Sequence, residues 1–288
     1  QKQPAYIRRM ILQDMYRFFR LFYQRSQLVN PFDRHHSIFV ADDLFDGTGL
    51  SKVFPDLCYF MLKHKNKNAL ASLLPKYNDE SDARCMLTHG IYELNFAHNP
   101  ASAAKYLEKA IKLQPDSRRV KSMLARAYFE TENYNDAAKW YGIIYNEDNS
   151  SKTNALNYCV ALSKAEKYAE AINLLYKLDI EYPDSISVIR VLAWNLMGMN
   201  KLQQAEREYK RITKSNEAEN GDWLNAGYCQ WFIGNISEAI NMFKTFMSFQ
   251  SKNQSNNLYD EFSKDRSFLL SHGIDEIDIL LMTDLIKE

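Results

Sequence analysis

Glycine and proline are scarce in this sequence, and their scarcity argues against folds built from sheets and tight turns. The chain of 288 residues holds only 9 glycines and 7 prolines, whereas glycine alone averages about 7% of the residues in globular proteins. Because these two residues occupy most tight turns, a chain with so few of them favours long helices. An apolar content of 46% supplies enough side chains for a substantial core. The composition therefore predicts a nearly all-α fold.

An excess of charge of either sign is also absent. Lysine plus arginine and aspartate plus glutamate number 36 each, which argues against a broad electrostatic surface for nucleic acid or for an anionic membrane. No apolar run reaches the roughly 18 residues that a membrane-spanning helix needs, and the first residues lack the pattern of a secretion signal. We therefore expect a soluble protein with neither a nucleic acid nor a membrane as its partner.

No pair of cysteines has the C-x-x-C spacing. All four lie within apolar helical patterns, at Cys58, Cys85, Cys159 and Cys229, so we expect buried reduced thiols and a cytoplasmic location. The chain begins at Gln1 without a methionine. We therefore expect that something upstream has been removed: a signal peptide, another domain, or the rest of an artificially shortened chain. Export after removal of a signal peptide is the alternative to the cytoplasmic location.

Catalytic and metal-binding motifs are likewise missing. The chain contains no G-x-S-x-G, no P-loop and no H-E-x-x-H. The segment DDLFDG matches a calcium loop only in part, because Leu44 and Val53 stand where ligands belong. His35 and His36 lie near Asp42, but adjacent side chains diverge in an extended segment, which favours a polar loop over a metal site. We predict no enzymatic activity, no metal site and no cofactor.

What the sequence does contain is a repeat. Alanines recur at a step of 34 residues, at Ala103, Ala137, Ala171, Ala205 and Ala239. Large apolar side chains follow each alanine at the spacing of a buried helical stripe. Twelve residues before four of the alanines stands another small residue, at Ala125, Cys159, Ala193 and Gly227. We interpret each unit as two helices whose small residues meet at a close crossing, which makes Ala171 a spacer and not a catalyst. Gly90 lies one position early in the first unit, where we expect a shortened turn near Asn99 and Pro100.

The repeat resembles the tetratricopeptide repeat, and the last unit carries the family's pattern most clearly. Its residues Trp223, Ala226, Gly227, Ala239 and Phe243 follow W-x-x-L-G…A-x-x-x-F with alanine in place of leucine. The period places five repeats at residues 84–117, 118–151, 152–185, 186–219 and 220–253. The resemblance implies an α-solenoid of antiparallel helix pairs. Residues 1–83 would then form extra N-terminal helices that continue or cap the stack, and residues 254–288 a C-terminal capping helix pair.

The two ends carry apolar helical patterns of their own. Residues 5–28 are apolar around most of a helix, which predicts a buried helix; the alternative is an amphipathic helix for a membrane or a partner. Residues 258–271 and the residues after Asp275 read as two further helices. The last helix is apolar on two sides, with Ile277, Leu281 and Leu285 on one and Ile279, Met282 and Ile286 on the other. We predict a homodimer through this helix, with Ile279 and Met282 in the interface.

The resemblance also implies a concave face, lined by the first helix of each repeat, that binds a partner. Aromatic residues and arginines, which commonly anchor interfaces, gather on it. The predicted partner-binding residues are Tyr92, Arg119, Arg126, Phe129, Leu156, Asn157, Arg190, Trp194, Met197, Asn225, Tyr228 and Trp231. The arginines favour an acidic segment with apolar anchors. The alternative for these aromatic residues is that they pack against the next repeat.

Asn157 and Asn225 match the asparagines with which chaperone-binding members of the family grip a terminal carboxylate. Ser122, Ser187 and Val191 stand where that clamp needs basic or amide side chains, so we expect no carboxylate clamp. The sequence predicts a protein-interaction scaffold that binds a peptide or helix of another protein. The alternative is a regulatory or oligomerising part of a larger enzyme or sensor whose catalytic domain lies upstream of Gln1.

Overall fold

The computed structural model describes residues 67–76, 78–249 and 258–287, together with Cys58, Leu62 and Lys65. The predicted helix at 5–28, the loop at 31–51 with His35 and His36, and the polar run before residue 258 lie outside these residues. The chain divides into two compact units, one ending at Thr131 and the other beginning at Glu132. This boundary falls inside the predicted repeat 118–151, so the repeat boundaries stay a proposal.

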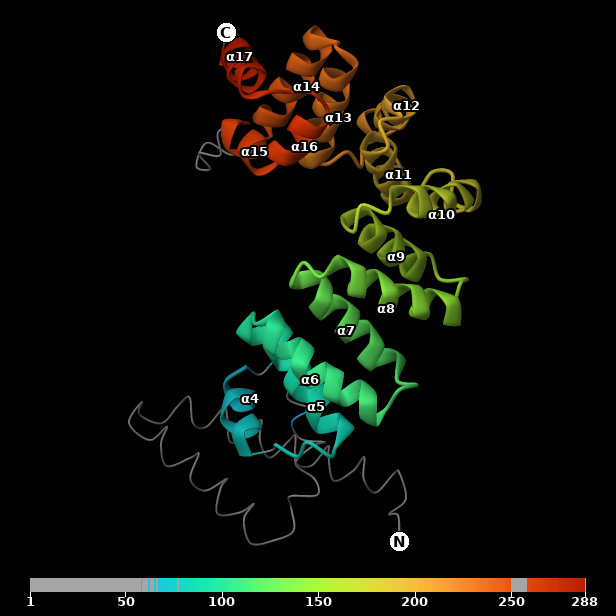
Figure 1. The fold of residues 1–288 in the computed structure, drawn as a ribbon, viewed down its shortest axis with the longest axis vertical. Coiled ribbons are helices and arrows are strands. Elements are labelled where there is room, and N and C mark those ends of the chain that lie inside the picture. The colour runs from blue at the N-terminus through green and yellow to red at the C-terminus, as the bar shows by residue number, and fades with distance from the viewer. Residues whose placement is uncertain are drawn as a thin grey trace, which may run out of the picture. The chain divides into compact units, whose positions relative to one another are not determined.

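The first unit is a stack of short helices. Its described elements are α4 (Lys67–Leu73), the 3-10 turn η3 (Leu74–Lys76), α5 (Ala83–Tyr92), the π-helical turn η4 (Glu93–Ala97), α6 (Pro100–Leu113) and α7 (Arg118–Glu130). α6 packs against both α5 and α7 (Figure 1). The core between them includes Cys58, Leu70, Cys85, Met86 and Val120.

The second unit is also built from helices that pack in sequence. They are α8 (Tyr134–Glu147), α9 (Lys152–Lys164), α10 (Tyr168–Glu181), α11 (Ile186–Gly198), α12 (Leu202–Thr213), α13 (Asn220–Ile233) and α14 (Ile236–Ser248), followed by α15 (Leu258–Lys264), α16 (Arg266–Ser271) and α17 (Glu276–Lys287). From α8 to α14 each helix packs against the next, and α11 also contacts α9 and α13 (Figure 1). The described residues contain no strand. The predicted all-α fold of helix pairs is confirmed.

The periodic alanines are buried within these helices. All five, Ala103, Ala137, Ala171, Ala205 and Ala239, have no exposed surface. The Sγ atom of Cys159 lies 3.9 Å from the carbonyl oxygen of Ala171, which places α9 directly against α10. A Cβ atom on Gly227 would lie 2.4 Å from the ring of Phe243. Side chains this small are therefore needed where the two helices of a pair approach each other.

Left-handed backbone recurs at the turn between the two helices of each pair. The residues are His98, Glu132, Glu166, Asn200 and Gly234, with φ values of 54°, 60°, 59°, 56° and 87°. Each stands five residues before its alanine, so the turn repeats with the same period as the sequence. Serines mark the start of the first helices: the Ser117 and Ser151 side chains accept hydrogen bonds from the N–H groups of Val120 and Asn154.

In the first helix pair, Gly90 lies one position early in the repeat, and the extra residue that follows it lies inside a helix and not in a turn. A Cβ atom on Gly90 would lie 2.5 Å from the side chain of Leu107, so Gly90 makes the close approach that Gly227 makes in the last pair. The extra residue is taken up by the π-helical turn at Glu93–Ala97. His98 then stands five residues before Ala103, as the corresponding turn residues do in the other pairs. The predicted shortened turn is therefore wrong.

Two predictions for the C-terminal helices also need correction. The single helix predicted at 258–271 is broken at Asp265 into α15 and α16, which points their buried side chains at different neighbours. In α17, Ile279 and Met282 are each only 2% exposed, because this side of the helix packs against α14 and α15. The exposed side carries Ile277, Leu280, Leu281 and Leu285.

Candidate functional site

In the first unit, the predicted groove residues lie at the C-terminal half of α5 and along α7. Tyr92 is half-buried and stacks on Phe96 with 5.9 Å between ring centroids. Arg126 donates hydrogen bonds to Glu130 Oε1 at 2.7 Å and to Asn95 Oδ1 at 2.8 Å. Of the remaining predicted residues of α7, Arg119 is exposed and Phe129 is half-buried. The Arg126 guanidinium is thus held by its own chain.

In the second unit, α9 contributes a half-buried Leu156 and an exposed Asn157. On α13, the predicted residue Asn225 is half-buried. All three side chains therefore keep part of their surface open on the first helices, and Asn157 is the most accessible of them.

Arg190 of α11 is bound to the start of α13. It donates to both carboxylate oxygens of Asp222, at 2.6 Å and 2.7 Å, and to the carbonyl oxygen of Glu217 at 3.3 Å. Asp222 is only 1% exposed and also accepts the backbone N–H of Glu219. The hydrogen bonds to Asp222 raise the pKa of Arg190. Arg190 therefore joins two neighbouring helix pairs. Like Arg126, it is paired within the chain, so a second arginine of the predicted basic groove is not available to a partner.

α16 lies over the predicted groove face of α11 and α13. The ring of Phe268 stacks on Trp194 with 4.8 Å between centroids and an interplanar angle of 20°. Phe268 also meets Phe232 of α13 edge-on at 5.7 Å. His272, at the end of α16, stacks on Phe232 at 4.3 Å, and its Nε2 lies 3.1 Å from the carbonyl oxygen of Met197. The part of the predicted partner-binding face on α11 and α13 therefore binds a helix of its own chain.

α15 and the break at Asp265 cover the rest of this face. Phe262 packs against Tyr228, Trp231 and Phe243, with centroid distances of 5.9, 5.4 and 5.2 Å. The Tyr228 hydroxyl donates to Asp265 Oδ2 at 3.0 Å. Burial raises the pKa of Tyr228 and also that of Asp265, because both anions would lie away from water. This site can hold aromatic rings and one poorly solvated carboxyl group.

Four of the predicted groove residues lie beneath α15 and α16. Met197, Tyr228 and Trp231 are buried there, and Trp194 is half-buried. Phe232, Asp265, Phe268 and His272 were not predicted, although they complete the aromatic cluster. They escaped the sequence analysis because three of them follow the last repeat, where no period identifies a facing residue.

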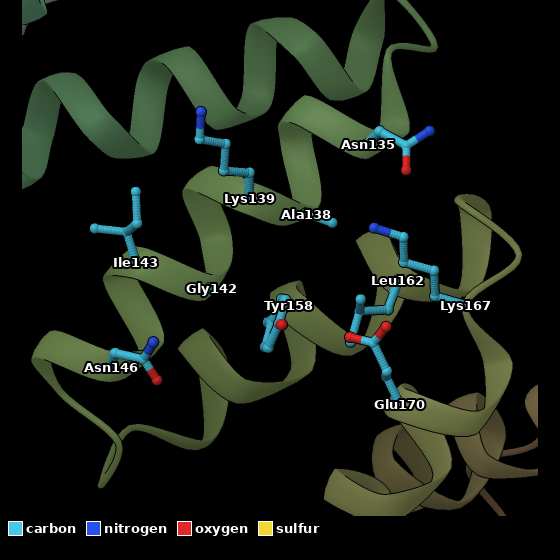
Figure 2. A pocket seen from close by; sticks show the side chains of 10 residues that line it. All are labelled: Asn135, Ala138, Lys139, Gly142, Ile143, Asn146, Tyr158, Leu162, Lys167 and Glu170. Atoms are coloured by element: carbon cyan, nitrogen blue, oxygen red, sulfur yellow. The ribbon is translucent and has the colours of Figure 1, made fainter.

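A separate cavity of about 220 Å³ lies between α8 and the pair α9 and α10. Tyr158 lies near its centre, with Asn146 on one side and Leu162 and Glu170 on the other (Figure 2). Gly142 makes room for the Tyr158 ring, which would lie 3.1 Å from a Cβ atom at that position. Burial raises the pKa of Tyr158. None of the predicted groove residues lines this cavity.

Within the described ranges, no three His, Cys, Asp or Glu side chains lie close enough together to share a metal ion. None of the helices in the described part of the chain combines the length and the apolarity that a membrane crossing requires.

Comparison with known proteins gives one family match and several structures of similar fold. The family model of the tetratricopeptide repeat matches residues 97–150. No curated protein is significantly similar in sequence to the chain. Among solved structures, MamA of AMB-1 is similar with a TM-score of 0.51 and 19% identity, over 57% of this chain and 97% of its own. MamA of Desulfovibrio magneticus RS-1 is similar with a TM-score of 0.52 and 14% identity, over 62% of this chain and 99% of its own.

At such identities these structures show a shared fold and nothing about partners. The matched residues 97–150 contain α6, α7 and α8, and the buried alanines of α6 and α8 recur with the same period as far as α14. Residues 97–150 therefore match the tetratricopeptide repeat, and the helix pairs of the chain share the fold of the MamA structures.

Proposed function

We propose that this chain is an interaction scaffold that binds a short segment of another protein on the first helices of its repeats. It acts through binding and not through catalysis, in keeping with the fold it shares with other repeat proteins. Helix pairs of this kind stack into an extended surface on which a partner helix or peptide can lie. The proposal places the chain in the cytoplasm, where its four cysteines would remain the buried, reduced thiols that the structure contains.

The observation that supports this function is the way in which α11 and α13 bind α16. Trp194, Phe232 and the Met197 carbonyl group hold an aromatic helix by two ring contacts and one polar contact. A surface that grips one amphipathic helix has the shape and chemistry to grip another. Because Arg126 and Arg190 are paired within the chain, we propose a partner anchored mainly by apolar and aromatic side chains, with few acidic ones.

Site-specific crosslinking in the native cell tests the proposal. Asn157 is exposed on α9, a first helix, and Asn173 is exposed on α10, a second helix. We expect the photoreactive substitution Asn157→p-benzoylphenylalanine to crosslink a second protein and the matched substitution Asn173→p-benzoylphenylalanine to crosslink none. Crosslinks from Asn173 alone would move the binding surface to the second helices and overturn the proposal.

Self-association is a second proposed interaction, and α17 supports it. Ile277, Leu280, Leu281 and Leu285 form an apolar stripe on its outer side, with exposed fractions of 65, 55, 57 and 42%. A second copy of the chain is the proposed occupant, since the stripe can pair with itself about a twofold axis. This interaction would also serve the alternative function, that of an oligomerising part of a larger protein.

A further inference from the structure

α16 is attached to the repeats by a small set of side chains with regular spacing. Asp265 receives the Tyr228 hydroxyl, Phe268 stacks on Trp194, and His272 stacks on Phe232. Phe268 lies within α16, and Asp265 and His272 flank it as its N-cap and C-cap residues, so the three contacts cover the helix from end to end. Leu269, beside Phe268, is fully buried, whereas Leu270 is 45% exposed. The contact therefore has the form of a short helical peptide in a groove.

The elements on either side of α16 have anchors of their own. Phe262 fixes α15 within the cluster of Tyr228, Trp231 and Phe243. Ile279 fixes α17, which packs against α14 and α15. The segment between these anchors, residues 265–273, is tied to its neighbours by the ion pair of Arg266 with Glu276 and by the hydrogen bond from the Asp265 N–H to the Glu261 carbonyl oxygen.

The seat of α16 also contains an unfavourable feature. Asp265 is half-buried, and this partial loss of water raises its pKa. The Tyr228 hydrogen bond and the nearby Lys164 and Lys264 favour its charged form, and Glu261 opposes it. A half-buried carboxylate that is only partly compensated weakens the docked state at neutral pH. The groove is therefore occupied by a helix whose affinity is below what the aromatic contacts alone would give.

We propose that α16 is a displaceable occupant of the groove, and that the partner is a short amphipathic helix that presents an uncharged hydrogen-bond acceptor, an aromatic residue three positions later and a second ring four positions after that. The inference rests on the proposed function and specifies the partner of the same surface. The partner and α16 compete for Trp194, Phe232 and the Tyr228 hydroxyl. Binding is then reduced by the fraction of molecules in which α16 is docked.

The probe is a fluorescein-labelled peptide with the sequence of residues 263–274, SKDRSFLLSHGI. Its binding to full-length chains is measured by fluorescence anisotropy. The double substitution F268A/H272A removes the two rings of α16 and should open the groove, whereas L270A changes an exposed position of the same helix and is the matched control. We expect the peptide to bind the double variant at least about tenfold more tightly than it binds the wild type or L270A. Adding W194A to the double variant should abolish binding.

Equal binding to the wild type and the double variant would place the peptide elsewhere and overturn the proposal. An absence of binding to a double variant that keeps its helical circular dichroism would do the same, because α16 would then be a permanent part of the fold. Hydrogen exchange of the wild type decides the matter if the double variant fails to fold. The amides of residues 266–273 should open with a smaller free energy than those of α13, and opening only by global unfolding would reject the inference.

The outcomes of the peptide-binding experiment and of the crosslinking experiment are independent of each other. Crosslinks from Asn157 without any peptide binding would leave an interaction scaffold in which α16 is fixed. Peptide binding to the double variant without crosslinks from Asn157 would support a groove for this helix and reject the proposed function of the α9 surface.

Discussion

Several single residues at the turns of the repeats have a strained backbone conformation. Glu132 and Glu166 hold a left-handed backbone at the turn of their pairs, where Asn200 and Gly234 have residue types better suited to it. A residue with a Cβ atom loses about 1–2 kcal/mol in this conformation. The shortage of glycine that predicted helices therefore leaves strain at the turns between them.

Replacing Glu166 with glycine should stabilise the protein. The substitution removes the strain at φ 59° and loses part of that gain to the greater freedom of glycine in the unfolded chain, for a net increase of about 0.5 kcal/mol in the free energy of unfolding. The matched change Lys177→Gly, at an exposed position inside α10, should lower it by about 1 kcal/mol. Urea denaturation of the two variants measures both. A loss of stability in Glu166→Gly would show that the side chain contributes more than the backbone strain costs.

The buried thiols should resist modification in the folded protein. Burial raises the pKa of Cys159 and of Cys229 to about 12, so only about one thiol in 10,000 is ionised near pH 8. The thiolate is the reactive form, and a thiol-specific reagent should therefore react slowly with the native chain. In urea, where the pKa returns to about 8.5, the same reagent should react at once. Rapid labelling of Cys159 in the native chain, detected by peptide mass spectrometry, would contradict the burial.

At the scale of elements, neighbouring pairs are joined by contacts that the period alone does not specify. Arg190 and Asp222 join α11 to α13 by two short hydrogen bonds. The Asn195 amide reaches from α11 to the Ser163 hydroxyl of α9 at 2.6 Å. Both links bridge consecutive first helices, so they fix how one pair sits on the next.

Arg190→Ala should therefore destabilise the second unit. Asp222 would remain buried without its cation, at a cost of about 3 kcal/mol; this is the lower end of the range for a broken buried ion pair, because Arg190 is 29% exposed. The matched change Arg207→Ala, on the exposed surface of α12, should cost less than about 0.5 kcal/mol. Thermal unfolding followed by circular dichroism separates the two. Equal midpoints would mean that Arg190 is free to serve a partner, as the sequence suggested.

How much could be predicted from the sequence depends on the period. The helix pairs, their buried alanines and the close approach at Gly227 were predictable because each feature recurs at the same step. The extra residue after Gly90 was misplaced, since a π-helical turn leaves no signal in residue types. The occupant of the groove was missed for a different reason: Phe268 and His272 lie beyond the last repeat, and only the break at Asp265 directs them back onto α11 and α13.

At the scale of the whole molecule, the C-terminal region uses its two apolar sides differently. One side of α17 closes the core, with Ile279 and Met282 each 2% exposed. The sequence assigned these two residues to a dimer interface, because a helix that is apolar all round shows no inner and outer side in its sequence. The structure leaves the opposite side open, so any contact between copies of the chain must use a different set of residues.

We expect the chain to be a dimer through the open side of α17. Light scattering should then give twice 33.7 kDa. The double substitution I277D/L281D should return the mass to that of one chain without loss of helicity, since both residues are more than half exposed. The control Ile279→Asp should instead lower the unfolding temperature, because it buries a charge next to α14 and α15. A single-chain mass for the wild type at the highest attainable concentration would reject the dimer. The exposed stripe would then be left to a different protein, and the crosslinks from Asn157 would remain the only guide to where that protein binds.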